Sequence, residues 1–145
     1  NKKLVNEIAN IYGEQSIIAS IDVKIENRKY CVYINNGKEK INIEFKKYLK
    51  EIENLPIGEI LLNSIDRDGT GFGLDLNLIK FIKDFKKPII LSGGLGKKEH
   101  FFDCLKNYSV DAVSTANLLN FLGSALYDVR KFLYKNNLKL ANWKF

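Results

Sequence analysis

An apolar segment of the sequence, residues 60–65, runs directly into two carboxylates, Asp66 and Asp68, and then into Gly69. A carboxylate at the end of a strand can act as a general acid or base toward a substrate beside it. Gly69 and Gly71 leave backbone N–H groups open to an anion. For Asp68 taken alone, an ordinary Asp-Gly turn is the commoner role. The strand context favours polar contacts or proton transfer next to a bound anion.

A second apolar segment, residues 88–91, ends in Ser92, Gly93 and Gly94. Because glycine has no Cβ, a phosphate can approach the backbone of such a pair closely. The alternative is that both glycines serve only a tight turn between a strand and a helix. We expect the pair to form part of a phosphate site.

A third candidate carboxylate, Asp22, closes an earlier apolar segment. Side chains two residues apart share one face of a strand, so Asp22 would point in the direction of Ser20. A partly desolvated carboxylate there suits general acid–base catalysis, and a loop acid paired with Lys24 is the alternative. Ser64 and Asp66 repeat this spacing on the next strand, so we expect them to repeat the geometry.

Strands and helices must position these residues, and the hydrophobic periodicity predicts them in alternation. An Asn-Gly step within residues 35–37 predicts a hairpin turn. Strands are predicted at residues 16–21, 28–34, 40–43, 59–65, 88–91 and 111–115, and helices at residues 1–12, 45–52, 76–85, 98–107 and 124–136. The parallel part amounts to four strand–helix units preceded by one helix.

Strands that are apolar on both faces and alternate with helices predict an α/β fold with a parallel sheet. A doubly wound sheet and a (β/α)8 TIM barrel both fit this order of elements. No Gly-x-Gly-x-x-Gly motif follows the first strand, so a dinucleotide site is not indicated. A barrel needs roughly 250 residues. The 145 residues would then be a single partial domain, the C-terminal half of a barrel truncated at its N-terminus.

The half-barrel interpretation has two consequences. In (β/α)8 enzymes a phosphate is often bound by the loops after strands seven and eight. In a second half these would be the loop at Gly93 and Gly94 and the loop at Ala116 and Asn117. An incomplete barrel also leaves open sheet edges, which favour pairing, so the chain is expected to self-associate or to bind a missing half.

The composition excludes several other classes of protein. The net charge is +6, but 20 of the 23 basic residues are lysines scattered along helix faces. This pattern indicates a solvated surface rather than a nucleic-acid site. No apolar run approaches the roughly 18 residues of a membrane helix. Cys31 and Cys104 lack the spacing of a metal site or a disulfide, so we expect reduced thiols and no metal. We also expect no cofactor and a cytoplasmic protein.

The motifs together resemble a known family. The chain is similar to the C-terminal half of the cyclase subunit of imidazole glycerol phosphate synthase, an enzyme of histidine biosynthesis. The resemblance covers nearly the whole chain, and the segment 64–70 is its most specific part. The matching residues are segments 19–24, 58–62, 64–70 and 92–94, together with Gly73, Asp75, Gly96, Lys97, Glu99, His100 and the hairpin around Gly37.

The resemblance implies a (β/α)8 lyase that partners a glutaminase. Ammonia from the glutaminase would pass up the barrel and attack a phosphoribulosyl-formimino aminoimidazole carboxamide ribonucleotide. The products would be imidazole glycerol phosphate and aminoimidazole carboxamide ribonucleotide. Of the family's two catalytic aspartates, the one on strand five matches Asp22, and the other belongs to the half that this chain lacks. Glu59 matches a charged residue at the ammonia entrance.

The same resemblance assigns a larger set of residues to the substrate and its phosphate. This set consists of Asn63, Ser64, Asp66, Asp68, Gly69, Ser92, Gly93, Gly94, Ala116 and Asn117. Within it, Gly69, the glycine pair and the Ala116-Asn117 step would meet one phosphate directly.

The chain departs from the family pattern at four positions. The family usually has Thr where Asn63 stands, Tyr at Leu74, Ala at Leu95 and Ser at Asn117. Asn63 resembles a paralogous branch that works with an amidotransferase in surface-sugar acetamidino modification. A third alternative is a half-barrel that only associates and does not catalyse.

Overall fold

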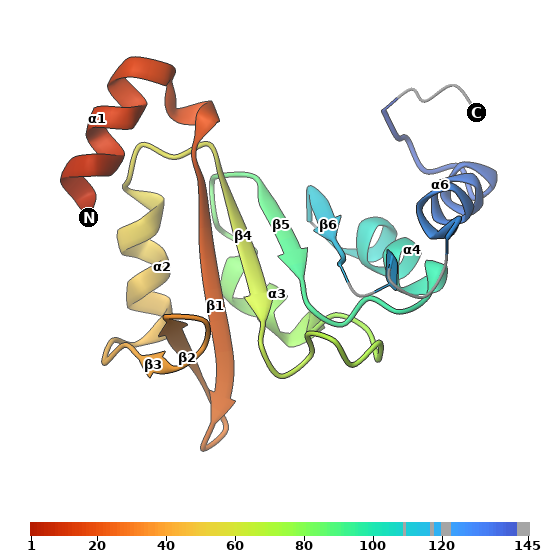
Figure 1. Ribbon diagram of the computed structural model, residues 1–145, viewed down its shortest axis with the longest axis horizontal. Coiled ribbons are helices and arrows are strands. Elements are labelled where there is room, and N and C mark those ends of the chain that lie inside the picture. Colours follow the sequence, from red (N-terminus) through yellow and green to blue (C-terminus); the bar gives the residue numbers. More distant parts are fainter. Residues whose placement is uncertain (109, 117, 120–122, 142–145) are drawn as a thin grey trace.

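The computed structural model describes residues 1–108, 110–116, 118–119 and 123–141, which form one six-stranded sheet with flanking helices (Figure 1). The strands lie in the order β3-β2-β1-β4-β5-β6. Their bounds are β1 (Ile18–Glu26), β2 (Lys29–Ile34), β3 (Glu39–Lys40), β4 (Glu59–Ser64), β5 (Ile89–Ser92) and β6 (Ala112–Ser114). The predicted α/β fold class is confirmed.

Four of the strands, β1, β4, β5 and β6, run parallel to one another. The other two, β2 and β3, pair antiparallel on the side of β1, and together with the last residues of β1 they form the hairpin, residues 24–40. The Asn-Gly turn joins these two strands as predicted, with Asn35, Asn36 and Gly37 all at positive φ. The hairpin therefore widens a parallel sheet that consists of the predicted four strand–helix units.

The bounds of the helices are α1 (Lys2–Tyr12), α2 (Phe45–Glu53), α3 (Ile79–Ile82), α4 (Lys98–Asn107) and α6 (Ala125–Lys135), with short 3₁₀ turns η1 (Glu14–Ser16) and η2 (Leu76–Leu78). The helices α2, α3 and α4 lie between successive parallel strands, whereas α1 precedes β1 and α6 follows β6. None of the helices in the described ranges is long and apolar enough to cross a bilayer.

The hydrophobic core lies on one face of the sheet. In β4, Ile60, Leu62 and Ser64 are buried, whereas the alternate residues Leu61 and Asn63 remain half-exposed on the other face. The buried strand residues pack with buried side chains of α2, α3, α4 and α6. A doubly wound sheet would bury both faces, so this arrangement is that of one half of a (β/α)8 barrel.

Two predicted elements are shorter than expected. The helix expected over residues 76–85 is only the turn η2 followed by α3, which ends at Ile82. Beyond it, the N–H of Lys86 donates to a Glu53 carboxylate oxygen at 2.7 Å, so that backbone group is taken by a tertiary contact instead of the helix. The strand expected over 40–43 ends at Lys40, with only two β2–β3 pairs formed.

Candidate active site

A row of four polar residues crosses the parallel sheet on its open face. Asp22 pairs with Asn63, Asn63 pairs with Ser92, and Ser92 pairs with Ser114. The side-chain Nδ2 of Asn63 donates a hydrogen bond of 3.0 Å to Oδ1 of Asp22. One carboxylate is thus held in register with an amide and two hydroxyls.

This polar row lines a small pocket with a volume of about 160 Å³. The lining residues come from the ends of all four parallel strands and from the loops that follow them: Ser20, Asp22, Leu61, Asn63, Asp68, Ser92, Gly93, Gly94, Leu95, Ser114, Thr115 and Ala116. The pocket therefore places two carboxylates, those of Asp22 and Asp68, and a glycine pair around one small space.

The sequence analysis placed Asp22 at the end of its strand, but the strand continues beyond it. The strand β1 continues to Glu26, because residues from Asp22 onward pair with β2. The parallel pairing with β4 stops at Val23, so Asp22 still lies at the carboxyl-terminal edge of the parallel sheet. Its side chain shares the pocket-lining face with Ser20, as expected.

The expectation that Ser64 and Asp66 repeat the geometry of Asp22 is wrong. Ser64 pairs with Val23, and its side chain is buried on the helix-covered face. Its carbonyl oxygen accepts the N–H groups of the turn that follows, at Arg67 and Asp68. It is Asn63, one residue earlier, that neighbours Asp22.

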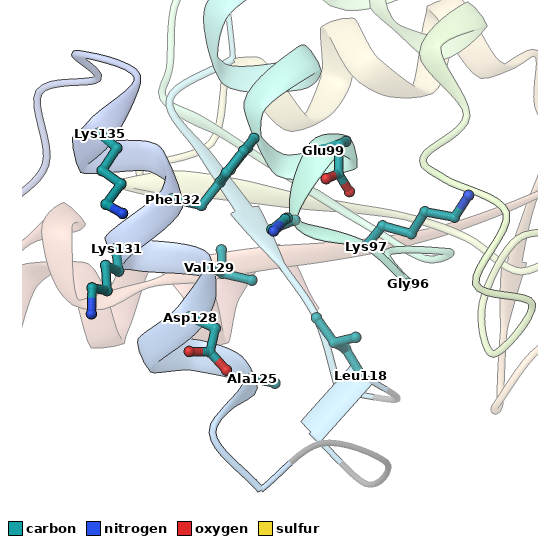
Figure 2. Close-up of a pocket in the computed structure, with 11 residues that line it drawn as sticks. Gly96, Lys97, Glu99, Leu118, Ala125, Asp128, Val129, Lys131, Phe132 and Lys135 are labelled. Carbon is teal, nitrogen blue, oxygen red and sulfur yellow. The ribbon is translucent and has the colours of Figure 1, made fainter.

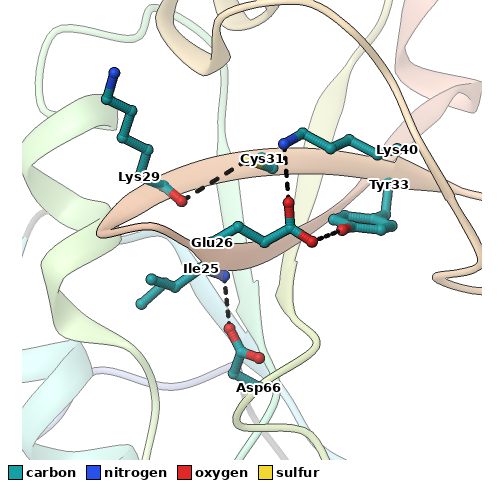
Figure 3. Close-up of polar contacts among 7 residues, drawn as sticks. All are labelled: Ile25, Glu26, Lys29, Cys31, Tyr33, Lys40 and Asp66. Carbon is teal, nitrogen blue, oxygen red and sulfur yellow. Dashed lines mark hydrogen bonds and ion pairs between the residues drawn. The ribbon is translucent and has the colours of Figure 1, made fainter.

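Asp66 points to the hairpin and not into the pocket. Its Oδ2 accepts the backbone N–H of Ile25 at 2.7 Å (Figure 3). Ile25 lies in the part of β1 that extends beyond the parallel sheet. Asp66 therefore connects the loop after β4 to the hairpin.

The glycine pair brings the loops after β4 and β5 together, at the end of the sheet where the arrowheads lie (Figure 1). Gly93 and Gly94 have φ values of 93° and 101°, which side chains rarely adopt. A Cβ on Gly93 would lie 2.6 Å from the Ser64 carbonyl oxygen. The Gly94 carbonyl accepts the N–H of Gly73 at 2.7 Å. The pair thus serves close backbone packing, while both residues also line the pocket.

Asp68 lines this pocket and also an adjoining hollow of about 310 Å³. Asp22 and Asn63 line both as well, and the hairpin turn contributes Asn36 and Gly37 to the second. The sequence had indicated the turn but not its place over the site. Its position depends on the pairing of β2 with β1, for which the sequence carries no local signal.

The remaining predicted residues are spread more widely. Gly69 has a φ of 76° in the loop after Asp68, and Ala116 lines the pocket at the end of β6. Glu59 begins β4, so it lies about 13 Å along the strand from Asn63, toward the opposite end of the sheet. Asn117 lies outside the described residues.

His100 supports the loop after β5. Its Nδ1 accepts the N–H of Gly96 at 3.3 Å, and its ring lies 3.6 Å from where a Cβ on Gly73 would be. Burial lowers the pKa of His100, and the nearby Lys97 ammonium lowers it further. The neutral ring that accepts this hydrogen bond is therefore the favoured form.

We expect protonation of His100 to destabilise the fold. Its pKa in the folded state lies below the unfolded value, so its stabilisation is complete above the unfolded pKa and declines as the pH falls. The free energy of unfolding, measured by urea titration between about pH 7 and pH 5, should fall more steeply for the wild type than for His100→Gln. Glutamine keeps an acceptor but does not titrate. Parallel curves for the two proteins would contradict this role.

The hairpin carries a separate polar cluster beside the site (Figure 3). Glu26 accepts the Tyr33 hydroxyl and pairs with Lys40 at 2.8 Å. Lys40 and then Tyr33 lower the pKa of Glu26, and the bond to Glu26 raises the pKa of Tyr33. Lys40 is exposed and Glu26 is partly exposed, so the cluster links β1, β2 and β3 without fully burying a charge.

A larger groove lies between the start of α4 and α6, with a volume of about 510 Å³ (Figure 2). Its wall includes Leu118, Val129 and Phe132, and the Lys98 ammonium lies 5.0 Å from the Phe132 ring centre. It contains none of the site residues assigned from the sequence.

Among the residues that the structure describes, no group of three or more His, Cys, Asp or Glu side chains could hold a metal ion.

Comparisons with known proteins find relatives along nearly the whole chain. A protein of Parasynechococcus marenigrum, provisionally named imidazole glycerol phosphate synthase subunit hisF2, is 41% identical over 139 residues, 94% of this chain and 52% of that protein. The imidazole glycerol phosphate synthase subunit HisF of Pyrobaculum aerophilum is 39% identical over 141 residues, 97% of this chain and 55% of that protein. HisF of Clostridium botulinum is 39% identical over 143 residues, 97% of this chain and 56% of that protein.

The chain spans about half the length of the curated relatives that it matches. The model of the family described as histidine biosynthesis protein matches residues 1–126, which include every described strand of the sheet. The chain therefore belongs to the histidine biosynthesis protein family.

Proposed function

We propose that this chain forms the C-terminal half of an imidazole glycerol phosphate synthase cyclase, and that it supplies one catalytic carboxylate and one phosphate site. The observation that carries the proposal is the polar row, in which Asp22 lies in register with Asn63 and Ser92 beside the glycine pair. The names of the relatives support the same activity.

In this proposal Asp22 moves protons as ammonia adds to the substrate and the imidazole ring closes. The hydrogen bond from Asn63 fixes the orientation of the carboxylate, and the open pocket beside it admits the reacting atoms. A second carboxylate would come from strand one of the completed barrel. The backbone at Gly69, Gly93 and Gly94 would hold one phosphate, because these glycines, all at positive φ, have no Cβ to keep a phosphate away from the backbone.

The position of Glu59 supports the end of the sheet at which the glutaminase partner would bind. It lies at the start of β4, at the far end of the sheet from the pocket. Ammonia that enters at that end would travel along the open face of the sheet toward Asp22, within a completed barrel.

The two cysteines are buried, free thiols, and burial raises the pKa of Cys104 to about 11. Such thiols suit an enzyme of a reducing compartment such as the cytoplasm.

The surface-sugar alternative has less support. It rests on Asn63, whose amide here binds Asp22, a role that either substrate would allow. The names of the relatives favour the histidine pathway. We therefore retain the histidine-pathway cyclase as the single proposed function.

We expect the isolated chain to form dimers or larger assemblies and to lack cyclase turnover. In the part of the chain that the structure describes, β6 has only β5 as a strand neighbour, and residues 18–21 of β1 pair only with β4. Such edges favour pairing with another chain. Light scattering of the purified chain, together with an ammonia-dependent cyclase assay, measures both points. A monodisperse monomer, or turnover at the rate of a full barrel, would refute this expectation.

The experiment that tests the function joins the chain to the first half of the Pyrobaculum aerophilum relative. The joined protein is assayed with ammonium as nitrogen donor for formation of imidazole glycerol phosphate. Separately, inorganic phosphate is titrated into the ¹⁵N-labelled chain, with the amides of Gly69, Gly93 and Gly94 as reporters. Turnover together with shifts at these amides supports the proposal. A folded joined protein without turnover, and glycine amides that phosphate does not shift, would reject it.

A further inference from the structure

The loop between β4 and η2 is fastened to the hairpin at both of its ends. Near its start, Asp66 accepts the N–H of Ile25 at 2.7 Å (Figure 3). At its finish, Oδ2 of Asp75 accepts the Tyr30 hydroxyl at 2.8 Å. These contacts join residues 41 and 45 positions apart in the sequence, so tertiary packing creates both of them.

Besides hydrogen bonds within its own turns and one backbone bond from Gly73 to Gly94, the segment between these two anchors is distinguished by its glycines. Gly69, Gly71 and Gly73 all lie at positive φ, and Phe72 between the last two is 80% exposed. Glycines lose more conformational freedom on ordering than other residues, so this segment would be costly to order on ligand binding alone. The same segment leads from Asp68 to Gly73, whose N–H binds Gly94.

Tyr30 is well placed to act as an anchor. Its ring centre lies 5.8 Å from that of Phe45 and 5.3 Å from that of Phe81, so its orientation is fixed from two sides. Burial, followed by the hydrogen bond to Asp75, raises the pKa of Tyr30, so its hydroxyl remains a donor at neutral pH.

Asp75 is the receiving end of this anchor. The residue is 5% exposed, and its Oδ1 also accepts the N–H of Asn77 in the turn η2. One buried carboxylate therefore joins the hairpin, the end of the glycine loop and the following turn. Loss of the Tyr30 hydroxyl would leave one of its oxygens without this partner, at a cost in free energy.

We propose that Tyr30 is a positioning residue of the phosphate site, which acts through Asp75 to hold the glycine loop in its binding conformation. This inference rests on the proposed phosphate site at Gly69, Gly93 and Gly94. Tyr30 does not line the pocket, so its effect reaches the ligand only through the loop. Ordering the loop before binding reduces the entropy that the ligand must overcome.

The variant Tyr30→Phe tests this role, with Tyr33→Phe as the matched control. Tyr30 and Tyr33 both lie on β2, and each substitution removes one phenol hydroxyl that donates to a carboxylate. The carboxylate bound by Tyr33 is that of Glu26, which belongs to the hairpin and not to the glycine loop. The phenylalanine ring retains the packing against Phe45 and Phe81. Thermal unfolding of both variants establishes that each is folded before the loop is examined.

Two readouts are taken on the full chain. Amide hydrogen exchange reports the order of residues 68–73 without ligand, and the phosphate titration reports affinity through the glycine amides. For Tyr30→Phe we expect faster exchange in the loop and roughly tenfold weaker phosphate binding, with neither change in Tyr33→Phe. Loop exchange equal to that of the wild type would overturn the role of Tyr30. A wild-type chain whose glycine amides ignore phosphate would instead reject the phosphate site.

Discussion

Replacing Asp22 with asparagine in the joined barrel should lower the turnover number by roughly 10²- to 10⁴-fold, with phosphate affinity nearly unchanged. Asparagine keeps the size of the side chain, and its Oδ1 can still accept the hydrogen bond that Asn63 donates to Asp22. The substitution thus removes the group that exchanges protons and preserves the geometry of the polar row. The phosphate would still meet the glycine backbone.

Steady-state rates with ammonium, together with the phosphate titration, measure the two effects separately. Asp128→Asn is a suitable control, because that carboxylate also accepts one side-chain hydrogen bond, from Ser124 at 2.5 Å, but lies on α6 outside the pocket. Unchanged turnover in Asp22→Asn would remove the carboxylate from the mechanism. A matching loss of phosphate affinity would mean that the variant disturbs the site as a whole.

Gly94→Ala should be the most damaging of the small substitutions in the loops, lowering the free energy of unfolding by roughly 2–4 kcal/mol. The φ of Gly94 is 101°, and a Cβ there would collide with the carbonyl oxygen of Gly73 and lie 3.0 Å from the Cβ of Arg67. Backbone atoms cannot move aside as a flexible side chain can. The loops after β4 and β5 would separate, and phosphate binding should be lost with them.

Urea unfolding and the phosphate titration check this expectation. Gly123→Ala is the control, because no heavy atom of the described residues lies within 4 Å of its added Cβ and its φ is not in the positive range. The control should unfold close to the wild-type midpoint. If Gly94→Ala were as stable as the control, the close approach of the two loops would not matter to the fold.

The anchored loop and the glycine contacts indicate how the loops of the site are held in one conformation before a ligand binds. The hairpin holds the loop after β4 through Asp66 and Tyr30, and that loop holds the loop after β5 through the bond between Gly73 and Gly94. His100 secures the far side of the second loop through Gly96. The bonds at Tyr30 and His100 are partly buried, the bond at Asp66 is exposed, and the bond at Gly73 joins two backbone groups. Together they restrain the glycines that the phosphate would meet.

Much of the fold could be predicted because its signals are local. The helix α4 has the predicted bounds, Lys98–Asn107, since a helical period of apolar residues is readable from a single segment. The alternation of strands and helices likewise predicted the parallel sheet. The helix expected over residues 76–85 ends already at Ile82, and the N–H of Lys86 beyond it donates to Glu53 from another part of the chain, a non-local contact that no local pattern indicates.

The sequence by itself determined which residues stand near the carboxyl-terminal edge of the parallel sheet: Asp22, Asn63, Ser92 and the glycines that follow. Tertiary structure alone decided which of them face the pocket. Each face of β4 carries a leucine followed by a polar residue, Leu61 with Asn63 and Leu62 with Ser64, so the sequence could not decide which of the two polar side chains faces the pocket. Side chains alternate along a strand, and a shift of one residue in the pairing exchanges the two faces. The register of β4 against β1 made that choice, and the same packing created the contacts of Asp66 with Ile25 and of Tyr30 with Asp75.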